Sequence, residues 1–155
     1  MFLTDWTIVI EVSLIILFLI GSIVVASFLI VRSLIYSYKD VFKAHSKFDI
    51  ELRKSLNLIS KVVKDESLKA YDNVIIKELN YEEKKKLLTL VDFTFLSLNS
   101  KEEADSYLAE TYENLQELRR IRDSKVLIFN QKILMFPFNI YSKIMKMKKW
   151  DVFTS

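Results

Sequence analysis

His45 and Asp49 are the residues whose type and spacing come closest to a chemical site. His45 is the only histidine of the chain, and Asp49 follows one helical turn later, where a carboxylate can hold an imidazole proton. A zinc site needs further His or Cys ligands, and the chain has no cysteine. A di-iron bundle needs Glu-x-x-His pairs, but Phe42 stands where the glutamate belongs. We therefore expect His45 to be a packed side chain, and we expect no bound metal.

Other catalytic sets are equally incomplete. The pairs Glu82-Glu83 and Glu102-Glu103 lie at predicted helix starts, where carboxylates stabilise the helix dipole, and Asp65-Glu66 lies at a predicted helix end. The sole glycine, Gly21, lies in an apolar run, which excludes a glycine-rich phosphate loop. No serine or threonine is paired with His45. The sequence predicts neither an enzyme nor a cofactor.

The element that positions everything else is the uncharged stretch from Val12 to Val31. About 20 helical residues cross the hydrocarbon core of a bilayer, so this stretch predicts a transmembrane helix. A secretory signal has a basic front and an apolar run of about 7 to 15 residues, and neither feature is present here. Glu11 is expected at the hydrated outer edge, or alternatively in contact with another membrane protein. Small residues that a second span could contact are Ser13, Gly21, Ser22 and Ala26.

Charge around this stretch predicts the topology. No Lys or Arg precedes it, whereas Arg32, Lys39, Lys43 and Lys47 follow it. By the positive-inside rule, residues 1–11 lie outside, residues 12–31 span the cell (inner) membrane once, and residues 32–155 are cytoplasmic. The net charge of +3 is too small to indicate a nucleic-acid partner.

The cytoplasmic part is expected to be entirely helical, because glycine and proline each occur once. An apolar stripe at steps of three and four continues the first helix to about Asp65. A shorter helix is expected over Leu68 to Leu79. Capping boxes at Asn80/Glu83 and Ser100/Glu103 predict helices that begin near Tyr81 and Lys101, and Pro137 ends the last one. The prediction is a single transmembrane helix continuous with a long antiparallel four-helix bundle.

Short connections would return the chain to the membrane after Pro137, and from about residue 138 its tail is basic and aromatic. Such a segment can lie on an anionic leaflet. Alternatively, Trp150 and Phe153 cap the core of the bundle while the lysines are solvated. The residues predicted to contact the membrane surface are Lys143, Lys146, Lys148, Lys149, Trp150 and Phe153.

Two segments resemble blocks of the LemA family. FDIELRKSLNLISKVVK, from Phe48 to Lys64, resembles the I-D-V-x-L-K-R-R-x-D-L-I-P-N-L-V-x-x-V-K block, and the stretch from Phe129 to Phe153 resembles the closing Y-N-x-x-I-x-x-F-P-x-N-x-I segment with its basic, aromatic tail. The chain departs from the family at Ser60, where the family has Pro. The resemblance implies one membrane helix, an outside N-terminus and a cytoplasmic four-helix bundle, and it supplies no reaction. The signature residues, with structural roles, are Asp49, Leu52, Ile59, Asn130, Phe136, Pro137 and Asn139.

Two functional hypotheses follow. The chain is a membrane-anchored, non-catalytic module whose cytoplasmic bundle binds a protein partner, or it is a scaffold that self-associates through the first helix as a coiled-coil homo-oligomer. A small pore or lysis protein is a minor alternative, because a single span without polar lining residues makes a poor pore. Replacing Leu52 by lysine distinguishes the first two hypotheses.

Overall fold

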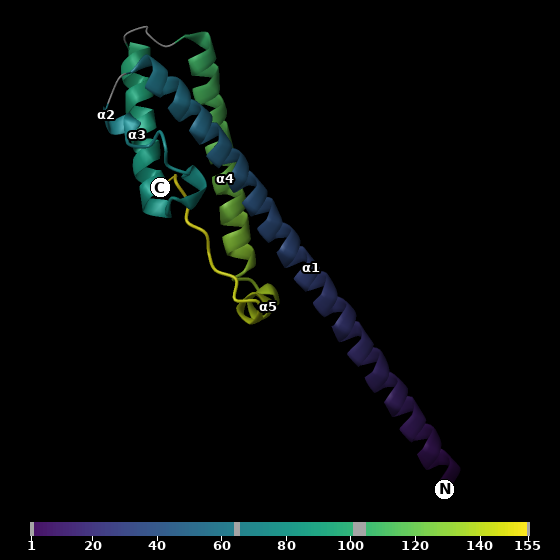
Figure 1. Ribbon diagram of the computed structural model, residues 1–155. Coiled ribbons are helices and arrows are strands. Elements are labelled where there is room, and N and C mark those ends of the chain that lie inside the picture. Colours follow the sequence, from purple (N-terminus) through teal and green to yellow (C-terminus); the bar gives the residue numbers. More distant parts are fainter. Residues whose placement is uncertain (1, 64–65, 101–104, 155) are drawn as a thin grey trace.

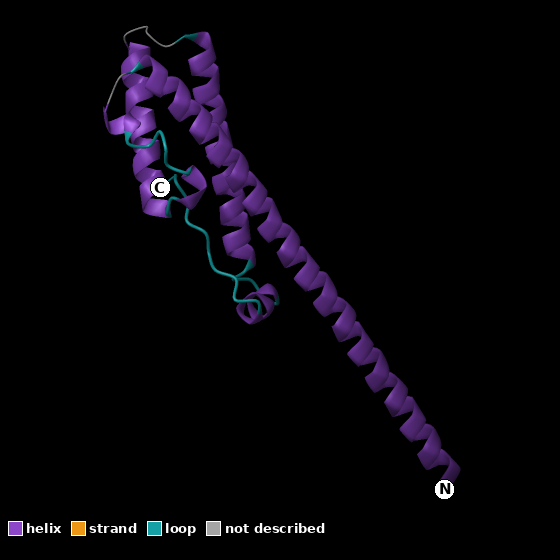
Figure 2. Cartoon of the chain, viewed as in Figure 1, coloured by secondary structure: helices purple, strands orange, loops and turns teal. Residues whose placement is uncertain are grey.

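The computed structural model describes residues 2–63, 66–100 and 105–154. Within these ranges the chain is helical and contains no strand (Figures 1 and 2). The elements are α1 (Phe2–Val62), α2 (Glu66–Lys69), the 3-10 helix η1 (Ile76–Glu78), α3 (Tyr81–Ser100), α4 (Ser106–Lys132) and α5 (Phe138–Ile144).

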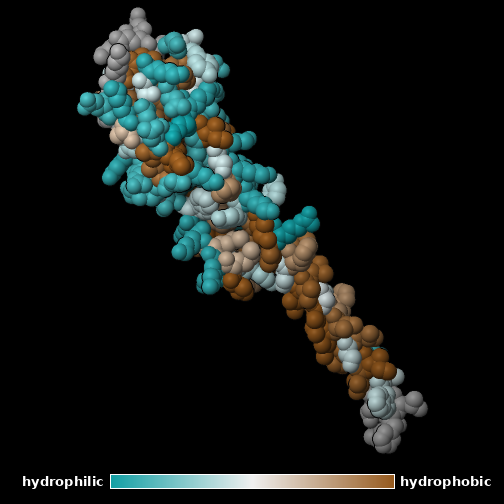
Figure 3. All heavy atoms as spheres, in the orientation of Figure 1, coloured by the Kyte–Doolittle hydropathy of each residue, from teal (hydrophilic) through white to brown (hydrophobic). Residues whose placement is uncertain are grey.

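Helix α1 is a single rod of 61 residues with two different halves. Every side chain from Trp6 to Ala26 is exposed, and this half extends beyond the rest of the molecule as an apolar shaft (Figure 3). By length and composition this helix is apolar enough to cross a membrane. From Ser27 onward α1 packs against other elements. The predicted continuation of the first helix through Arg32 is confirmed, although α1 ends at Val62 and the predicted end, Asp65, lies outside the described residues.

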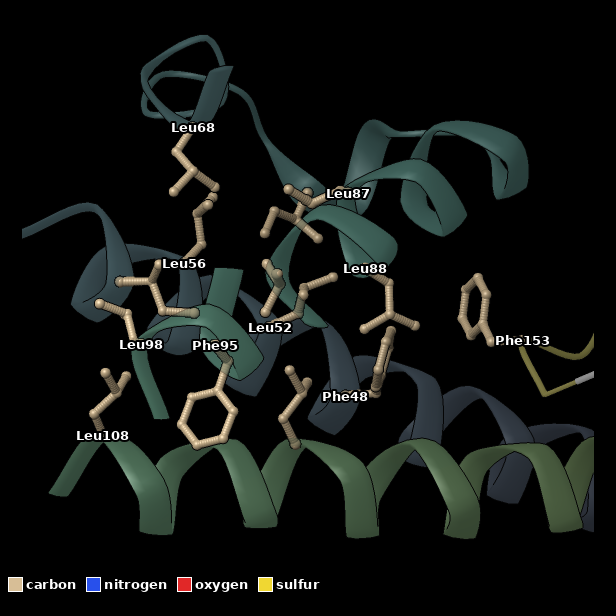
Figure 4. Packing of buried hydrophobic residues seen from close by; sticks show 14 residues of the cluster. Phe48, Leu52, Leu56, Leu68, Leu87, Leu88, Phe95, Leu98, Leu108 and Phe153 are labelled. Atoms are coloured by element: carbon tan, nitrogen blue, oxygen red, sulfur yellow. The ribbon is translucent and has the colours of Figure 1, made fainter. Parts of the chain in front are cut away.

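The second half of α1 packs chiefly against α4, which runs antiparallel to it, and α3 covers the end farthest from the apolar shaft (Figure 1). The predicted stripe supplies the core from α1, and leucines and a phenylalanine of α3 meet it across the bundle (Figure 4). Burial of these side chains removes apolar surface from water and is the main stabilising contribution. The fully buried core residues of α1 are Leu34, Phe48, Leu52, Leu56 and Ile59.

The prediction of a helix from Leu68 to Leu79 is wrong. The segment forms only the short α2, a turn and η1, so three long helices and not four make up the bundle in the described part of the chain. Asp72 and Asn73 favour a turn. Arg53 then fixes this turn, because its guanidinium donates to the backbone carbonyls of Tyr71 at 3.0 Å, Asp72 at 3.3 Å and Val74.

One of the two predicted capping boxes is confirmed. The backbone N–H of Glu83 donates to Asn80 Oδ1 at 2.9 Å, and the backbone N–H of Asn80 donates to Glu83 Oε2 at 2.8 Å. The prediction that the last long helix begins near Lys101 is wrong, because α4 begins at Ser106. Asp105 is its N-cap, and its side chain accepts from the backbone N–H of Leu108 at 2.7 Å. Lys101 and the pair Glu102-Glu103 lie outside the described residues.

The break at Pro137 is confirmed with a small shift. Helix α4 ends at Lys132, turns follow, and Pro137 is the N-cap of the seven-residue α5. This placement fits proline, which has no N–H to donate within a helix. Helix α5 lies beside α1 at the base of the bundle, and the tail after it runs back along the bundle toward the start of α3 (Figure 1).

Candidate functional site

A layer of buried charged side chains interrupts the apolar core where α1, α3 and α4 meet. Lys84 of α3 is 3% exposed, and its ammonium donates to both carboxylate oxygens of Asp49, at 2.9 and 2.8 Å. The same Nζ lies 3.0 Å from His45 Nε2. Asp49 and His45 share a face of α1 because they are four residues apart. The three groups form one hydrogen-bonded cluster.

A second ion pair belongs to the same layer. Arg122 and Asp123 of α4 are each 2% exposed, and Arg122 Nη1 donates to Asp123 Oδ1 at 2.6 Å. The guanidinium carbon of Arg122 lies 4.3 Å from the centre of the Phe153 ring, a cation–π contact. Burial by itself raises the pKa of Asp123, but hydrogen bonds from Arg122, Thr154 and Phe153 outweigh it, so the pKa is lowered and the carboxylate stays charged.

His45 is neutral in the folded protein at neutral pH. Burial, the largest cause, lowers its pKa from 6.5 to about 4; Asp49 raises it, and Lys84 and Arg122 lower it further. Two N–H groups of the Lys84 ammonium donate to Asp49. The third donates to Nε2 of the neutral His45 imidazole. His45 Nδ1 is buried without a partner. This lysine is fully occupied as a donor, and the cluster offers no free nucleophile.

Two further observations bear on chemistry. No group of three or more His, Cys, Asp or Glu side chains that could hold a metal ion occurs between Phe2 and Thr154 outside the undescribed gaps. Beside the charged layer lies an open pocket of about 220 Å³. It is lined by His45, Leu79, Tyr81, Lys84, Arg122, Lys149, Trp150, Asp151 and Phe153. Because the buried charges around it are paired with each other, the pocket is best described as the seam where the C-terminal tail meets the three helices.

Three polar side chains fasten the tail along this seam. Asp123 Oδ2 accepts from the backbone N–H of Phe153 at 3.0 Å and from both the N–H and the hydroxyl of Thr154 at 2.8 Å. Asn130 binds the backbone of Trp150 at both ends, donating to its carbonyl at 2.8 Å and accepting from its N–H at 2.9 Å. The Tyr81 hydroxyl donates to the carbonyl of Val152 at 2.7 Å. The tail is therefore an integral part of the bundle.

This fastening requires a correction to the residues predicted to contact the membrane surface. Phe153 is buried between Phe48 and Tyr81, with ring centres 5.2 and 5.3 Å away, so it caps the core. Trp150 is half-buried against Tyr38 and His45. The prediction is therefore wrong for Phe153, whereas contact of Trp150 and the lysines with a membrane surface stays a prediction. The four lysines, Lys143, Lys146, Lys148 and Lys149, are exposed.

The residues of the LemA-like segments fall at structurally distinct places. Leu52 and Ile59 are fully buried in the core, Asp49 holds Lys84, and Asn130 fastens the tail. Phe136 is exposed, Pro137 is the N-cap of α5, and Asn139 is half-buried with its Oδ1 unpartnered. Comparison with known proteins finds no match. No family model, curated protein or solved structure matches this chain.

Lys84, Arg122 and Asp123 were missed as site residues, although their spacing carried a signal. Lys84 stands one turn before Leu87 and Leu88, on the stripe that continues to Val91, but it opens the run Lys84-Lys85-Lys86, which is typical of a solvated surface. Arg122 fills the gap between Leu118 and Val126 at steps of four. A charged residue at a stripe position predicts a buried ion pair, and only the folded structure identifies its partner.

Acidification is expected to destabilise the bundle through His45. Between pH 7 and 5 the unfolded histidine, with a pKa near 6.5, takes up a proton that the folded one, with a pKa of about 4, does not bind. Stability therefore falls with pH, by about 2 kcal/mol from this residue alone. The measurement is urea unfolding of the full chain in detergent, followed by Trp150 fluorescence in a Trp6→Phe background.

The matched control is His45→Gln, which keeps a neutral acceptor for Lys84 and does not titrate. The two proteins differ in this one titratable side chain, so the difference between their unfolding free energies across the pH range reports on the histidine. Parallel pH profiles for the two proteins would show that His45 is protonated equally in the folded and unfolded states.

Proposed function

We propose that this chain is a single-pass membrane protein whose cytoplasmic helical bundle binds a protein partner at the membrane and catalyses no reaction. The observation that carries the proposal is the continuity of α1, one helix with a bare apolar half and a half that builds the core of the bundle. An apolar shaft exposed on every side is unfavourable in water and favourable in a bilayer. The bundle is thereby held at a fixed distance from the membrane.

The proposal that the chain catalyses no reaction is supported by the contacts of the ionisable groups in the core. Lys84, Asp49, Arg122 and Asp123 pair within the bundle, and Asp123 also fastens the tail. These contacts occupy the ammonium of Lys84 and both carboxylate oxygens of Asp49 and of Asp123. The cluster stabilises a particular packing of three helices and a tail, which suits a module with a defined surface.

A protein partner is supported by the outer face of α3. Phe93 is 74% exposed, and Leu96, three residues later on the same face, is also exposed. Large apolar side chains that lie together on a surface are typical of interaction sites. The two LemA-like sequence segments are compatible with this proposal. Membership of the LemA family is part of it as a hypothesis.

The alternative, a coiled-coil scaffold, needs the stripe of α1 to be available to a second copy. In a single copy that stripe is already buried by α3 and α4, which favours the module. Another candidate surface for self-association is the small-residue face around Gly21 in the apolar shaft.

Labelling of single cysteines tests the anchor and its direction. The chain has no cysteine, so Thr4→Cys and Lys86→Cys each introduce one site. In intact cells an impermeant maleimide is expected to label position 4, and position 86 only after the membrane is permeabilised. Release of the protein from membranes by alkaline carbonate would refute the anchor, and labelling of position 86 alone in intact cells would reverse the orientation.

Photocrosslinking tests the partner surface. A benzophenone amino acid at Phe93 is expected to give one discrete adduct in native membranes, whereas the same group at Lys86, an exposed residue two turns earlier on α3, is expected to give less of it. Equal adducts at both positions, or none at Phe93, would contradict a binding face there.

A further inference from the structure

Helix α5 contacts α1 within the uncharged stretch from Val12 to Val31 and not beyond its end. The hydroxyls of Ser27 and Tyr141 are 2.5 Å apart, and Ile30 and Tyr141 pack against the same cluster of core residues. Ser27 stands four residues before Val31, the last residue of the uncharged stretch. At about 1.5 Å per residue, the contact with α5 lies about 6 Å inside the end of that stretch. A bilayer that covers the whole uncharged stretch from Val12 to Val31 therefore reaches α5 as well.

The surface that α5 presents at this level is apolar. The bundle leaves uncovered the turn before α5 and one face of α5, and apolar atoms gather at this end of the bundle in Figure 3. Phe136, at the tip of the turn, is 78% exposed, more than any other large hydrophobic residue in the described part of the chain. We call these residues the basal wedge: Leu134, Met135, Phe136, Ile140 and Ile144.

Charge around the basal wedge has one sign. From Lys132 to Trp150 the sequence contains lysines and no acidic residue. Lys143, Lys146, Lys148 and Lys149 are exposed and form no ion pair within the described part of the chain. Lys132, in contrast, donates to the hydroxyls of Ser33 and Ser37 of α1. Apolar side chains flanked by exposed lysines are the composition of segments that lie in an anionic membrane interface.

We propose that the basal wedge inserts into the cytoplasmic leaflet beside the point where α1 leaves the bilayer, with the neighbouring lysines at the anionic headgroups. The inference rests on the proposed membrane anchor and adds a second, peripheral contact to it. Lipid is the occupant that the geometry favours, because the Ser27–Tyr141 contact joins α5, which carries part of the wedge, to the last turns of the uncharged stretch. Two contacts fix the tilt of the bundle, which a single helix leaves free.

Depth-dependent quenching tests the wedge in the full chain. Phe136→Cys and Phe93→Cys introduce one cysteine each at residues of nearly equal exposure, 78% and 74%. Both carry an environment-sensitive fluorophore, and the protein is reconstituted in phosphatidylcholine vesicles with added phosphatidylglycerol. Lipids with a nitroxide on the acyl chain are expected to quench the label at 136, located about 5 to 10 Å below the surface, and to leave the label at 93 unquenched.

A third label, at Phe18→Cys in the apolar shaft, separates the two proposals. Quenching at 18 and 136 but not at 93 supports the wedge. Quenching at 18 without quenching at 136 overturns the wedge and leaves the anchor intact, as would be found if a protein or a second copy covered this surface. Absence of quenching at 18 overturns the anchor and the wedge with it.

Discussion

Leu52→Lys is expected to unfold the helical bundle. Leu52 is fully buried at the centre of the core, where it faces leucines of α3 (Figure 4). The substitution removes a buried leucine, which by itself costs about 2 to 5 kcal/mol, and places an ammonium group there without a partner. A total loss of about 5 kcal/mol or more is comparable to the whole stability of a domain of this size. Loss of near-ultraviolet circular dichroism and rapid cleavage by trypsin are the measurements.

The matched control is Ile50→Lys, the same kind of change two residues away on the same helix. Ile50 is 68% exposed, so this variant is expected to fold with a change of less than about 0.5 kcal/mol. The pair also distinguishes the two functional hypotheses. If Leu52→Lys abolished an oligomer while the near-ultraviolet spectrum and helicity persisted, the stripe of α1 would serve self-association and the module proposal would fail.

The long helices of this fold were predictable because each depends on local sequence pattern. The steps of three and four along α1, the capping box at Asn80 and Glu83, and the proline at 137 act within a few residues of themselves. The segment from Leu68 to Leu79 failed for the opposite reason. Its backbone carbonyls are bound by Arg53, a residue of another helix, and no periodicity in the segment records that contact.

In the charged layer, too, the local features were predictable from the sequence and the contacts between distant residues were not. That Lys84 lies on an apolar stripe is a local fact, readable from its distance to Leu87 and Leu88. That its partner is Asp49, 35 residues earlier, depends on the register of α3 against α1. The tail is a similar case, because its basic and aromatic composition is compatible both with lipid contact and with core capping. The backbone N–H of Phe153 donates to Asp123, and the 2% exposed Phe153 ring caps the core. The backbone N–H of Trp150 donates to Asn130, and its ring is half-buried.

Removal of the carboxylate of Asp49 is expected to destabilise the bundle almost as much as the core substitution. Asp49→Leu leaves the ammonium of Lys84, 3% exposed, with the neutral His45 as its one remaining partner in the cluster. An uncompensated buried charge costs about 3 to 5 kcal/mol. Adding Lys84→Met to Asp49→Leu is expected to recover most of this loss, because well-packed apolar residues replace a buried ion pair at little cost. Urea unfolding of the single and double variants measures both effects.

The control for the change from carboxylate to leucine is Glu117→Leu. Glu117 pairs with Arg120 at 2.7 Å on the surface, where the two side chains are 50% and 75% exposed, so its loss is expected to cost less than about 1 kcal/mol. The recovery in the double variant is the decisive comparison, because a purely steric effect of leucine at position 49 would persist when Lys84 is replaced. If the double variant were as unstable as Asp49→Leu alone, the cost would lie in packing at position 49 and not in the buried charge. Recovery would instead assign the charged layer to the fit of α3 against α1.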